Sequence, residues 1–403
     1  MSRDLITIWS IERGSLLAVE SLCAVQNNKT KLPKGDRMKD LMTGMDLHRN
    51  NIVIALVDLE GKRLGHRRVD CKLSDVLAFL APHRDRVNTI AVESTYNWYW
   101  LVDGLVDHKY KVVLANPAKI QTYAGLKHSD DKSDAYWLTE MLRLGILPTG
   151  YIYDPALRPV RDLLRRRMGL VQHRTGLLLS FKSLYTRTHG LSLSSSQFNA
   201  LDAEEIQKLY PHRGDQIIAL AQKGHIEQLN DSIQSIEKYV LKIVRQMSGY
   251  ERLTTLPGVG KILGMTIALE VGDISRFKGP ENFASYCRMV DAQRTSNDKF
   301  KGDNNQKCGN RYLSWAYVEA ANFARRFHDT CRQWFDRKAA KVGKIVATKA
   351  LGCKLAKFFV ASHGQGRRFR RGTNVSRIER EGSMMIGRAA VSQAMGLVKS
   401  PQI

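Results

Sequence analysis

The pattern of apolar and polar residues divides the chain into a part with short strands and a later part with long helices. Short apolar runs that suit single buried strands alternate with stretches in which apolar residues recur at helical spacing. A turn at Glu60-Gly61 joins the first two strands as a hairpin. We expect strands at 51–58, 63–69, 89–93 and 111–115, and helices at 73–80, 99–107 and 133–144. A hairpin followed by strand–helix units predicts an α/β domain.

The strand pattern stops after this domain. Residues 157–188 and 226–247 carry apolar residues three and four apart, which predicts two long helices that pair antiparallel as an arm or coiled coil. A third unit opens with Leu256-Pro-Gly-Val-Gly260-Lys261, a turn between two helical segments. We expect a helix-hairpin-helix there, in a C-terminal domain that is mainly α-helical.

These changes of pattern predict a division into five segments. Residues 1–41 lack clear patterning, and we expect them to be an extension outside the core fold, either disordered or upstream of the native start. The remaining segments are the α/β domain at 42–150, a basic helical arm at 151–249, a helical domain at 250–345 and a basic tail at 346–403.

The charge balance points to a polyanionic partner. The chain has 63 Lys+Arg against 39 Asp+Glu, a net charge of +24. No apolar stretch is long enough to span a membrane and there is no basic amphipathic anchor, which favours nucleic acid over a membrane surface. The six cysteines are scattered without a C-x-x-C pair, and acidic residues interrupt the start of the chain where a signal peptide would be apolar. We therefore expect a cytoplasmic protein with reduced thiols.

Four carboxylates suggest a metal site. Asp46 precedes the first apolar run, Glu93 ends the next one, and Asp131 and Asp134 share one face at the start of a helix. Two carboxylates about 4 Å apart repel each other by roughly 4 kcal/mol at an effective dielectric of 20, so a fold gathers such groups around a cation. This requires Asp46 and Glu93 to lie on neighbouring strands. The alternative is that Asp46 and Asp131 only cap turns, as aspartates often do.

Two basic features could hold phosphate groups. In the 256–261 turn, Gly258 and Gly260 would expose backbone N–H groups, and Lys261 adds positive charge. The predicted helix at 157–188 carries six arginines between Arg158 and Arg174, among them Arg161 and Arg165. They form either a solvated helix face or a surface for a phosphate backbone, and their uniform sign favours the second.

A serine in a basic loop is a candidate nucleophile. Ser296 lies among positively charged residues, namely Arg294, Lys299, Lys301, Lys307 and Arg311. A hydroxyl that attacks phosphorus needs positive charge close to the developing oxyanion. Considered by itself, the residue pattern favours an ordinary loop serine.

The order of these parts resembles the DEDD transposases of the insertion-sequence-110 family, which are related to the RuvC Holliday-junction resolvase fold. The resemblance covers roughly residues 42–345. It rests on the Ser296 loop and on these segments: Met45-Asp46-Leu-His48, Val92-Glu93-Ser94, Asp131-Lys-Ser-Asp134-Ala135, Leu256-Pro-Gly-Val-Gly260, Phe283-Ala-Ser-Tyr286 and Gly309-Asn-Arg-Tyr-Leu313.

The resemblance implies a fold and a mechanism. It implies that Asp46, Glu93, Asp131 and Asp134 bind Mg²⁺, with Mn²⁺ as an alternative, in an RNase H/RuvC-like domain. It also implies that Ser296 forms a covalent phosphoserine link to DNA. In this family the serine loop of one protomer is completed by the acidic site of another, which implies a homo-oligomer (a dimer or tetramer), and a structured guide RNA pairs with the DNA.

The chain departs from the family pattern at two places. Asn297 follows the serine where the family has Gly, and residues 287–292 lack the expected Gly and Pro. Three functions therefore remain open: a DNA recombinase that uses Ser296, a junction-resolving endonuclease that uses only the carboxylates and metal-activated water, and an inactive nucleic-acid-binding scaffold.

Overall fold

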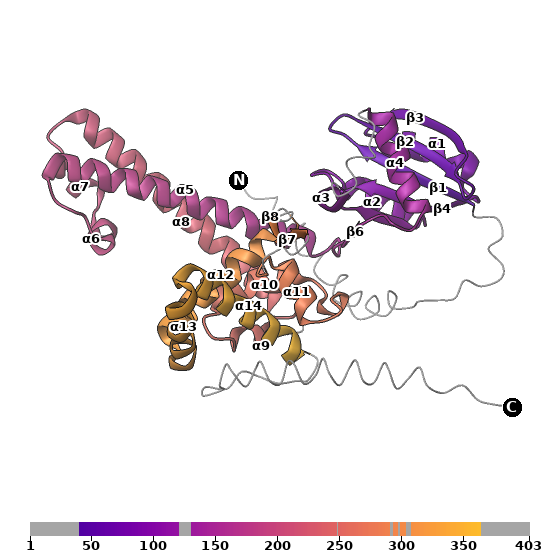
Figure 1. Ribbon diagram of the computed structural model, residues 1–403. Coiled ribbons are helices and arrows are strands. Elements are labelled where there is room, and N and C mark those ends of the chain that lie inside the picture. Colours follow the sequence, from indigo (N-terminus) through magenta and orange to yellow (C-terminus); the bar gives the residue numbers. More distant parts are fainter. Residues whose placement is uncertain are drawn as a thin grey trace. The chain divides into compact units, whose positions relative to one another are not determined.

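The chain folds into two compact units. The computed structural model describes residues 40–120, 130–247, 249–290, 293–296, 299–303 and 308–363. The first unit ends at Tyr151 and the second begins at Ile152 (Figure 1). Each unit has its own fold.

A six-stranded mixed sheet forms the first unit, with strand order β3-β2-β1-β4-β5-β6. β1 is antiparallel to β2 and parallel to β4, and β5 runs parallel to β4. This confirms the predicted α/β class with its leading hairpin. The strands are β1 (Leu41–Leu47), β2 (Asn51–Asp58), β3 (Arg63–Asp70), β4 (Val87–Glu93), β5 (Val112–Ala115) and β6 (Thr149–Gly150).

The first strand was not predicted. β1 lies inside the sheet and begins at Leu41, the last residue of the expected N-terminal extension. Asp46 therefore lies within a strand of its own rather than ahead of the strand at 51–58. Gly44 and Asp46 interrupt the apolar pattern of β1, and neither residue type is common in strands. In the structure, Gly44 lies where a helix packs against the sheet, and Asp46 belongs to a cluster of polar side chains.

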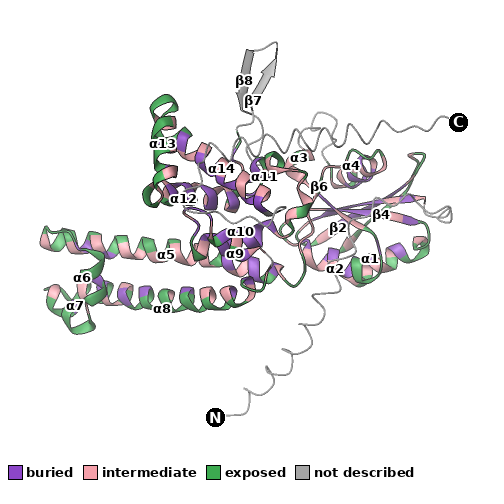
Figure 2. Ribbon diagram, turned by 90° about the horizontal axis from the view of Figure 1, so that it is seen from below, coloured by how far each residue is buried: buried purple, intermediate pink, exposed green. Residues whose placement is uncertain are grey.

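Helices cover both faces of this sheet. They are α1 (Leu73–Leu80), α2 (Tyr99–Asp107), α3 (Pro117–Ile120) and α4 (Asp131–Arg143), with a short 3₁₀ turn at Ala81–His83. α1 and α2 coincide with their predicted ranges, and α4 begins two residues before the predicted 133. α4 lies on one face, and α1 and α2 lie on the other (Figure 2).

Gly44 allows α4 to approach the sheet closely. A Cβ atom at this position would overlap the carbonyl oxygen of Ala135 and the hydroxyl of Thr139, and would lie 2.8 Å from the Thr139 amide nitrogen. Ala135 packs with Val53 of β2 in the same buried cluster. The missing side chain therefore sets the distance between α4 and β1.

Two long helices of the second unit pair antiparallel (Figure 1). α5 (Arg158–His189) matches the predicted helix within one residue at each end, whereas α8 (Arg213–Val244) begins well before the predicted 226. Arg174 of α5 donates to Asn230 of α8 at 3.0 Å, and Arg167 pairs with Glu237 at 2.6 Å, so the two helices run in opposite directions.

Two short helices close the far end of this pair. They are α6 (Ser195–Ala200) and α7 (Ala203–Leu209), and each starts with a capping box, at Ser194 and at Asp202. Phe181, Phe198 and Tyr210 form part of a small hydrophobic core at this end. Neither helix was predicted, although Ser194-Ser-Ser-Gln197 and Asp202-Ala-Glu-Glu205 carry the sequence signature of a helix start.

The rest of the second unit is helical apart from one hairpin. The helices are α9 (Tyr250–Thr254), α10 (Lys261–Val271), α11 (Pro280–Tyr286), α12 (Arg311–Phe327), α13 (Asp329–Val342) and α14 (Lys344–His363), with a 3₁₀ turn at Ile274–Arg276. The hairpin consists of β7 (Gln293–Ser296) and β8 (Lys299–Asp303). The expected mainly helical C-terminal part is thus confirmed. None of the helices that the structure describes combines the length and apolarity needed to cross a bilayer.

The helical core extends past the expected boundary at residue 345. α14 continues to His363, and its Leu351, Leu355 and Phe359 belong to the same hydrophobic core as α10 and α12. The first part of the expected basic tail at 346–403 is therefore a packed helix. Residues 364–403 lie outside the described part of the chain.

The close approach at Gly44 predicts that alanine substitution destabilises the protein far more at Gly44 than at Gly65, a second strand glycine. Gly44→Ala should lower the free energy of unfolding by about 2 kcal/mol or more, because helix backbone occupies the space of the new methyl group. Gly65→Ala is the matched control, since Gly65 of β3 has open space around its Cβ position. It should change stability by no more than about 0.5 kcal/mol. Urea unfolding of both variants measures this, and equal effects would contradict the role of Gly44.

Candidate functional site

Asp46 and Glu93 lie side by side in the sheet. β1 and β4 are parallel, with Met45 opposite Val92, so the two acidic residues come next on their strands. Partners in a parallel register present their side chains on the same face of the sheet. Asp46 is 3% exposed, and Glu93 is half-buried at the end of β4. The requirement that these two residues lie on neighbouring strands is therefore met.

The start of α4 reaches the same face. Asp130 caps the helix by accepting a hydrogen bond from the Ser133 amide at 2.5 Å. Ala135 packs over Gly44, two residues before Asp46 on the strand. Asp131, one helical turn before Ala135, therefore lies above the Asp46 end of β1. The short distance between helix and sheet brings these carboxylates together.

Asp46, His48 and Asp131 form a compact cluster in which one ligand atom of each residue lies within 4.8 Å of the others. The His48 Nε2 atom is 3.1 Å from the Asp46 Oδ2 atom and 3.5 Å from the Asp131 Oδ1 atom. Arg68 of β3 donates from Nη2 to Asp131 Oδ2 at 2.6 Å. Arg68 reaches the site because it pairs in the sheet with Val53, which in turn pairs with Asp46.

Among the described residues, this cluster unites two of the four predicted carboxylates. Asp46 and Asp131 belong to it, whereas Glu93 and Asp134 are outside the group that meets within 4.8 Å. Glu93 is nevertheless adjacent to Asp46 in the sheet, and Asp134 lies in the first turn of α4 with Asp131. All four positions thus border one region, although their carboxyl groups do not all meet.

Sequence reasoning did not assign a role to His48 or Arg68. A signal for His48 was present, because residues two apart on an extended chain point to the same face and His48 follows Asp46 at that spacing. Arg68 could not be identified without the strand register, since β3 has several exposed basic residues. The structure thus adds an imidazole and a guanidinium to a site predicted to be purely acidic.

The cluster suits a divalent cation. Carboxylate oxygens are the ligands that Mg²⁺ and Mn²⁺ prefer, and imidazole is a ligand for several transition metals. Asp46 supplies a carboxylate that is nearly inaccessible to solvent, and a buried carboxylate requires a compensating partner. Asp46, Asp131 and His48 could therefore bind a divalent metal, and the residues by themselves do not specify which one.

Ser296 lies in the second unit, at the end of β7. It pairs with Lys299 across the turn of the two-stranded hairpin. Arg294 and Lys299 are in the same two strands, and Arg311 is exposed at the first position of α12. Lys307 and Asn297 lie outside the described residues. The candidate nucleophile and the acidic cluster belong to different units of the fold.

The predicted phosphate-binding turn is partly packed against the protein and partly exposed. Gly258, with φ +77°, packs against α12, where a Cβ atom would overlap the Ala320 carbonyl oxygen. Gly260 is exposed as the N-cap of α10, and Lys261 is exposed as its first residue. The first glycine therefore serves packing, while the second glycine and the lysine are open to a ligand.

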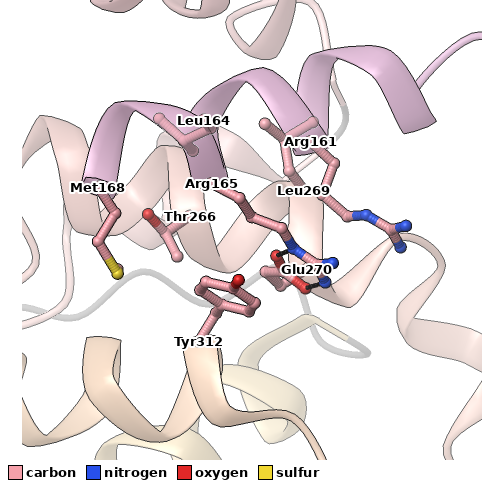
Figure 3. A pocket seen from close by; sticks show the side chains of 8 residues that line it. All are labelled: Arg161, Leu164, Arg165, Met168, Thr266, Leu269, Glu270 and Tyr312. Atoms are coloured by element: carbon pink, nitrogen blue, oxygen red, sulfur yellow. Dashed lines mark hydrogen bonds and ion pairs between the residues drawn. The ribbon is translucent and has the colours of Figure 1, made fainter. Parts of the chain in front are cut away.

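The arginines of α5 are largely occupied within the protein. Arg161 is buried with its guanidinium 3.8 Å from the centre of the Tyr153 ring, and Arg165 forms an ion pair with Glu270 (Figure 3). Arg158, Arg167 and Arg174 also bond to other residues of the chain, and Arg166 is exposed. The sequence prediction considered a solvated helix face or a phosphate-binding surface. It did not consider a third role, in which these arginines pair α5 with the neighbouring parts of the protein. Nucleic-acid contacts by Arg161 and Arg165 would have to compete with these interactions.

The cluster predicts how metal affinity responds to substitution. Asp46→Asn or Asp131→Asn should weaken Mn²⁺ binding at least about tenfold, because each change removes an anionic ligand. Arg68→Gln should strengthen binding, because the guanidinium competes with the metal for Asp131. Electron paramagnetic resonance of free Mn²⁺ during a titration measures all three.

Asp70→Asn is the matched control, since Asp70 is an exposed carboxylate of β3 that pairs with Lys72. It should bind Mn²⁺ as the wild type does. Equal affinities for the Asp46→Asn protein and the wild type would contradict the assignment of the cluster.

Comparisons with known proteins agree with this combination of parts. A transposase family model matches residues 43–189, and the model of the IS116/IS110/IS902 transposase family matches residues 250–336. The chain is 25% identical over 56% of its length to the transposase y4qE of Sinorhizobium fredii, of which the match spans 55%. It is 24% identical over 58% of its length to a family 20 transposase of Pseudomonas aeruginosa, and this match spans 70% of that protein. It is 22% identical over 65% of its length to the transposase of element IS1111A of Coxiella burnetii, and this match spans 72% of that protein. The chain belongs to the IS110 family of transposases.

Proposed function

We propose that this protein cuts and rejoins the DNA of an insertion sequence, using the acidic cluster of the first unit and Ser296 of the second. The observation that carries the proposal is the convergence of Asp46, His48 and Asp131 at the carboxyl end of the inner strand β1, in a chain of a transposase family. A site of this kind acts on phosphate esters when a divalent cation is bound.

Asp46 and Asp131 would hold the metal, and Glu93 and Asp134, which border the same region, would add oxygen ligands. Mg²⁺ is the proposed ion because carboxylates dominate the site, and Mn²⁺ is the alternative because it accepts the imidazole of His48 more readily. When bound, the cation polarises a phosphate oxygen and stabilises the charge that develops on it during the reaction.

The proposed cutting step is a direct displacement at phosphorus. The Ser296 Oγ atom loses its proton and forms a bond to phosphorus, while the bond from phosphorus to the leaving sugar oxygen breaks. The leaving oxygen takes up a proton and becomes a hydroxyl. Reversal of this step with another DNA end rejoins the strands and releases the serine, so the phosphodiester energy is conserved. Positive charge from the surrounding arginines and lysines would stabilise the oxyanion.

The proposal includes an oligomer, which the family resemblance implies. A serine hairpin from one protomer that completes the acidic site of another would prevent cutting by a lone protein. A homodimer or tetramer assembled on DNA therefore fits the expected pairing of partial sites.

Nucleic acid would contact exposed basic groups of the second unit. Gly260 and Lys261 at the start of α10 are open to a phosphate group, which suits a helix-hairpin-helix formed by α9 and α10. The other proposed contacts are Arg294, Lys299, Lys307 and Arg311, with Gly258 shaping the turn. A net charge of +24 is compatible with binding a second polyanion in addition to DNA. We propose that this second partner is a structured guide RNA from the same element.

Within this proposal each expected segment has a task. The metal site belongs to 42–150, the paired helices of 151–249 carry Arg161 and Arg165, and the serine hairpin belongs to 250–345. Arg161 and Arg165 of this arm would contact nucleic acid only if it displaced their partners within the protein, Tyr153 and Glu270.

Ser296→Ala separates the proposed recombinase from its alternatives. The variant should show no detectable cutting of a supercoiled plasmid that carries the element ends, assayed with Mg²⁺ and RNA transcribed from the element, because the attacking oxygen is absent. Ser285→Ala, a change at an exposed serine of α11, should cut at the wild-type rate. Gel analysis of the plasmid forms measures both.

Cutting that persists in the Ser296→Ala protein but disappears in Asp46→Asn would support a hydrolytic junction resolvase instead. Wild-type protein that binds both nucleic acids without any metal-dependent cutting would support an inactive scaffold.

Lys261→Ala should weaken DNA binding about equally for all sequences. Losing one phosphate contact should reduce the slope of log affinity against log salt by about 1. Lys111→Ala is the control, since Lys111 is an exposed lysine of the first unit and lies outside the proposed interface, and it should leave the slope unchanged. Fluorescence anisotropy over a salt series measures this. An unchanged slope for Lys261→Ala would remove this residue from the proposed interface.

A further inference from the structure

The most buried helix of the second unit contains one unexpected charge. Every residue of α10 from Leu263 to Val271 is buried, and in that span Glu270 is the only charged residue, 2% exposed. An ionised carboxylate in such a place is strongly disfavoured unless it is paired and hydrogen-bonded. Glu270 therefore has a specific partner or a specific task.

Two side chains surround this carboxylate. Arg165 of α5 donates from Nε to Oε1 at 2.5 Å and from its Nη2 to Oε2 at 2.7 Å, and Asn310 donates its side-chain amide to Oε2 at 2.7 Å. Figure 3 shows the two parallel bonds between Arg165 and Glu270, with the Tyr312 ring beside them. Burial works against the charge of Arg165, but the bonds to Glu270 outweigh it, and the pKa of Arg165 lies above its ordinary value.

Asn310 is the residue at which the chain returns from the serine hairpin to the helical core. Its amide nitrogen donates to the Tyr286 carbonyl oxygen at 2.7 Å, where the chain leaves α11 toward the hairpin. Arg288 closes the same gap by donating from Nη2 to the Gly309 carbonyl oxygen at 3.1 Å. The entry and exit of the hairpin are thus held together at its base.

The backbone at this base is constrained. Arg288 has φ +57°, a left-handed conformation that is uncommon for a residue with a side chain. Gly309, at φ +93°, lies so close to the opposite segment that a Cβ atom would be 2.6 Å from the Tyr286 carbonyl oxygen. Such constrained conformations persist only where the surrounding structure enforces them, and they concentrate at functional sites.

We propose that Glu270 is a positioning residue for the reaction: through Asn310 it fixes the base of the hairpin that carries Ser296, and through Arg165 it couples that base to α5. The inference rests on the proposed role of Ser296. It assigns a task to a buried ion pair that lies outside both the acidic cluster and the hairpin. It also gives the helical arm a direct connection to the hairpin, through a single carboxylate.

Asn310 has two roles that can be separated experimentally. Its Oδ1 atom caps α12 by accepting from the amides of Tyr312 and Leu313 at 2.8 and 3.1 Å, and its Nδ2 group donates to Glu270. Asn310→Asp keeps the cap, because aspartate is an equally good N-cap, but it sets a second carboxylate against Glu270. The variant therefore tests the bond to Glu270 without removing the start of α12.

The swapped pair restores this bond. In the Glu270→Gln/Asn310→Asp double variant, the new glutamine amide can donate to the new aspartate, while its carbonyl oxygen keeps the bond from Arg165 Nε and the bond from Arg165 Nη2 is lost. The network keeps one negative charge. Asn230→Asp is the matched control, because Asn230 also bonds to an arginine of α5, at a distance from the hairpin.

The test combines two measurements on the full-length protein. Hydrogen exchange without DNA reports on the hairpin base, at residues 286–290 and 308–310, and on α12 as a reference. Plasmid cutting at saturating DNA, with the element-end plasmid and its RNA, reports on the reaction. We expect Asn310→Asp to exchange faster at the base but not in α12, and to cut about 10 to 100 times more slowly with DNA affinity unchanged within twofold. The double variant should recover most of both losses, and Asn230→Asp should behave as the wild type.

Three results would overturn the inference: wild-type cutting by Asn310→Asp, a double variant that cuts no faster than Asn310→Asp, or loosening that spreads through α12 in proportion to the loss of rate. The exchange measurement does not depend on the identity of the nucleophile. If Ser296→Ala still cuts while Asn310→Asp behaves as expected, the proposed nucleophile is wrong and the positioning role of Glu270 stands.

Discussion

The contact between α4 and β1 is the constraint on which the candidate metal site depends. Gly44 lets the helix backbone pack directly onto the strand, and this brings Asp131 of the helix to the Asp46 end of the strand. A carboxylate side chain extends only a few ångströms from its backbone, so a larger separation of helix and sheet would leave these groups unable to share an ion. The placement of one glycine in a central strand thus sets the geometry of the candidate metal site.

The sequence predicted much of this fold because most elements of the first unit carry a clear period. The helices at 73–80 and 99–107 and the hairpin at 51–69 follow from local pattern alone. β1 was missed because the residues that shape the candidate site, Gly44 and Asp46, also interrupt its apolar pattern. The start of α8 was missed because Gly214 and Gly224 weaken the helical signal, and its stability comes from packing against α5.

The candidate site was only partly accessible from sequence. Asp46 and Asp131 could be named from their places at element ends, whereas Arg68 depends on strand register and Glu270 on the burial of α10. The arginines of α5 show the opposite error. Their number suggested an external phosphate surface, but charge counts do not reveal that Glu237, Glu270 and Asn230 face them from other helices. Long-range pairing of this kind has no local signature in the chain.

The central claim is that a metal-loaded acidic site and Ser296 act on the same phosphodiester. Mass spectrometry of protein trapped with element-end DNA, its RNA and Mg²⁺ tests this most directly. The account predicts a nucleotide covalently attached to the peptide that contains Ser296, formed in the wild type and absent from the Asp46→Asn protein. DNA that is cut while that peptide remains unmodified would contradict the account.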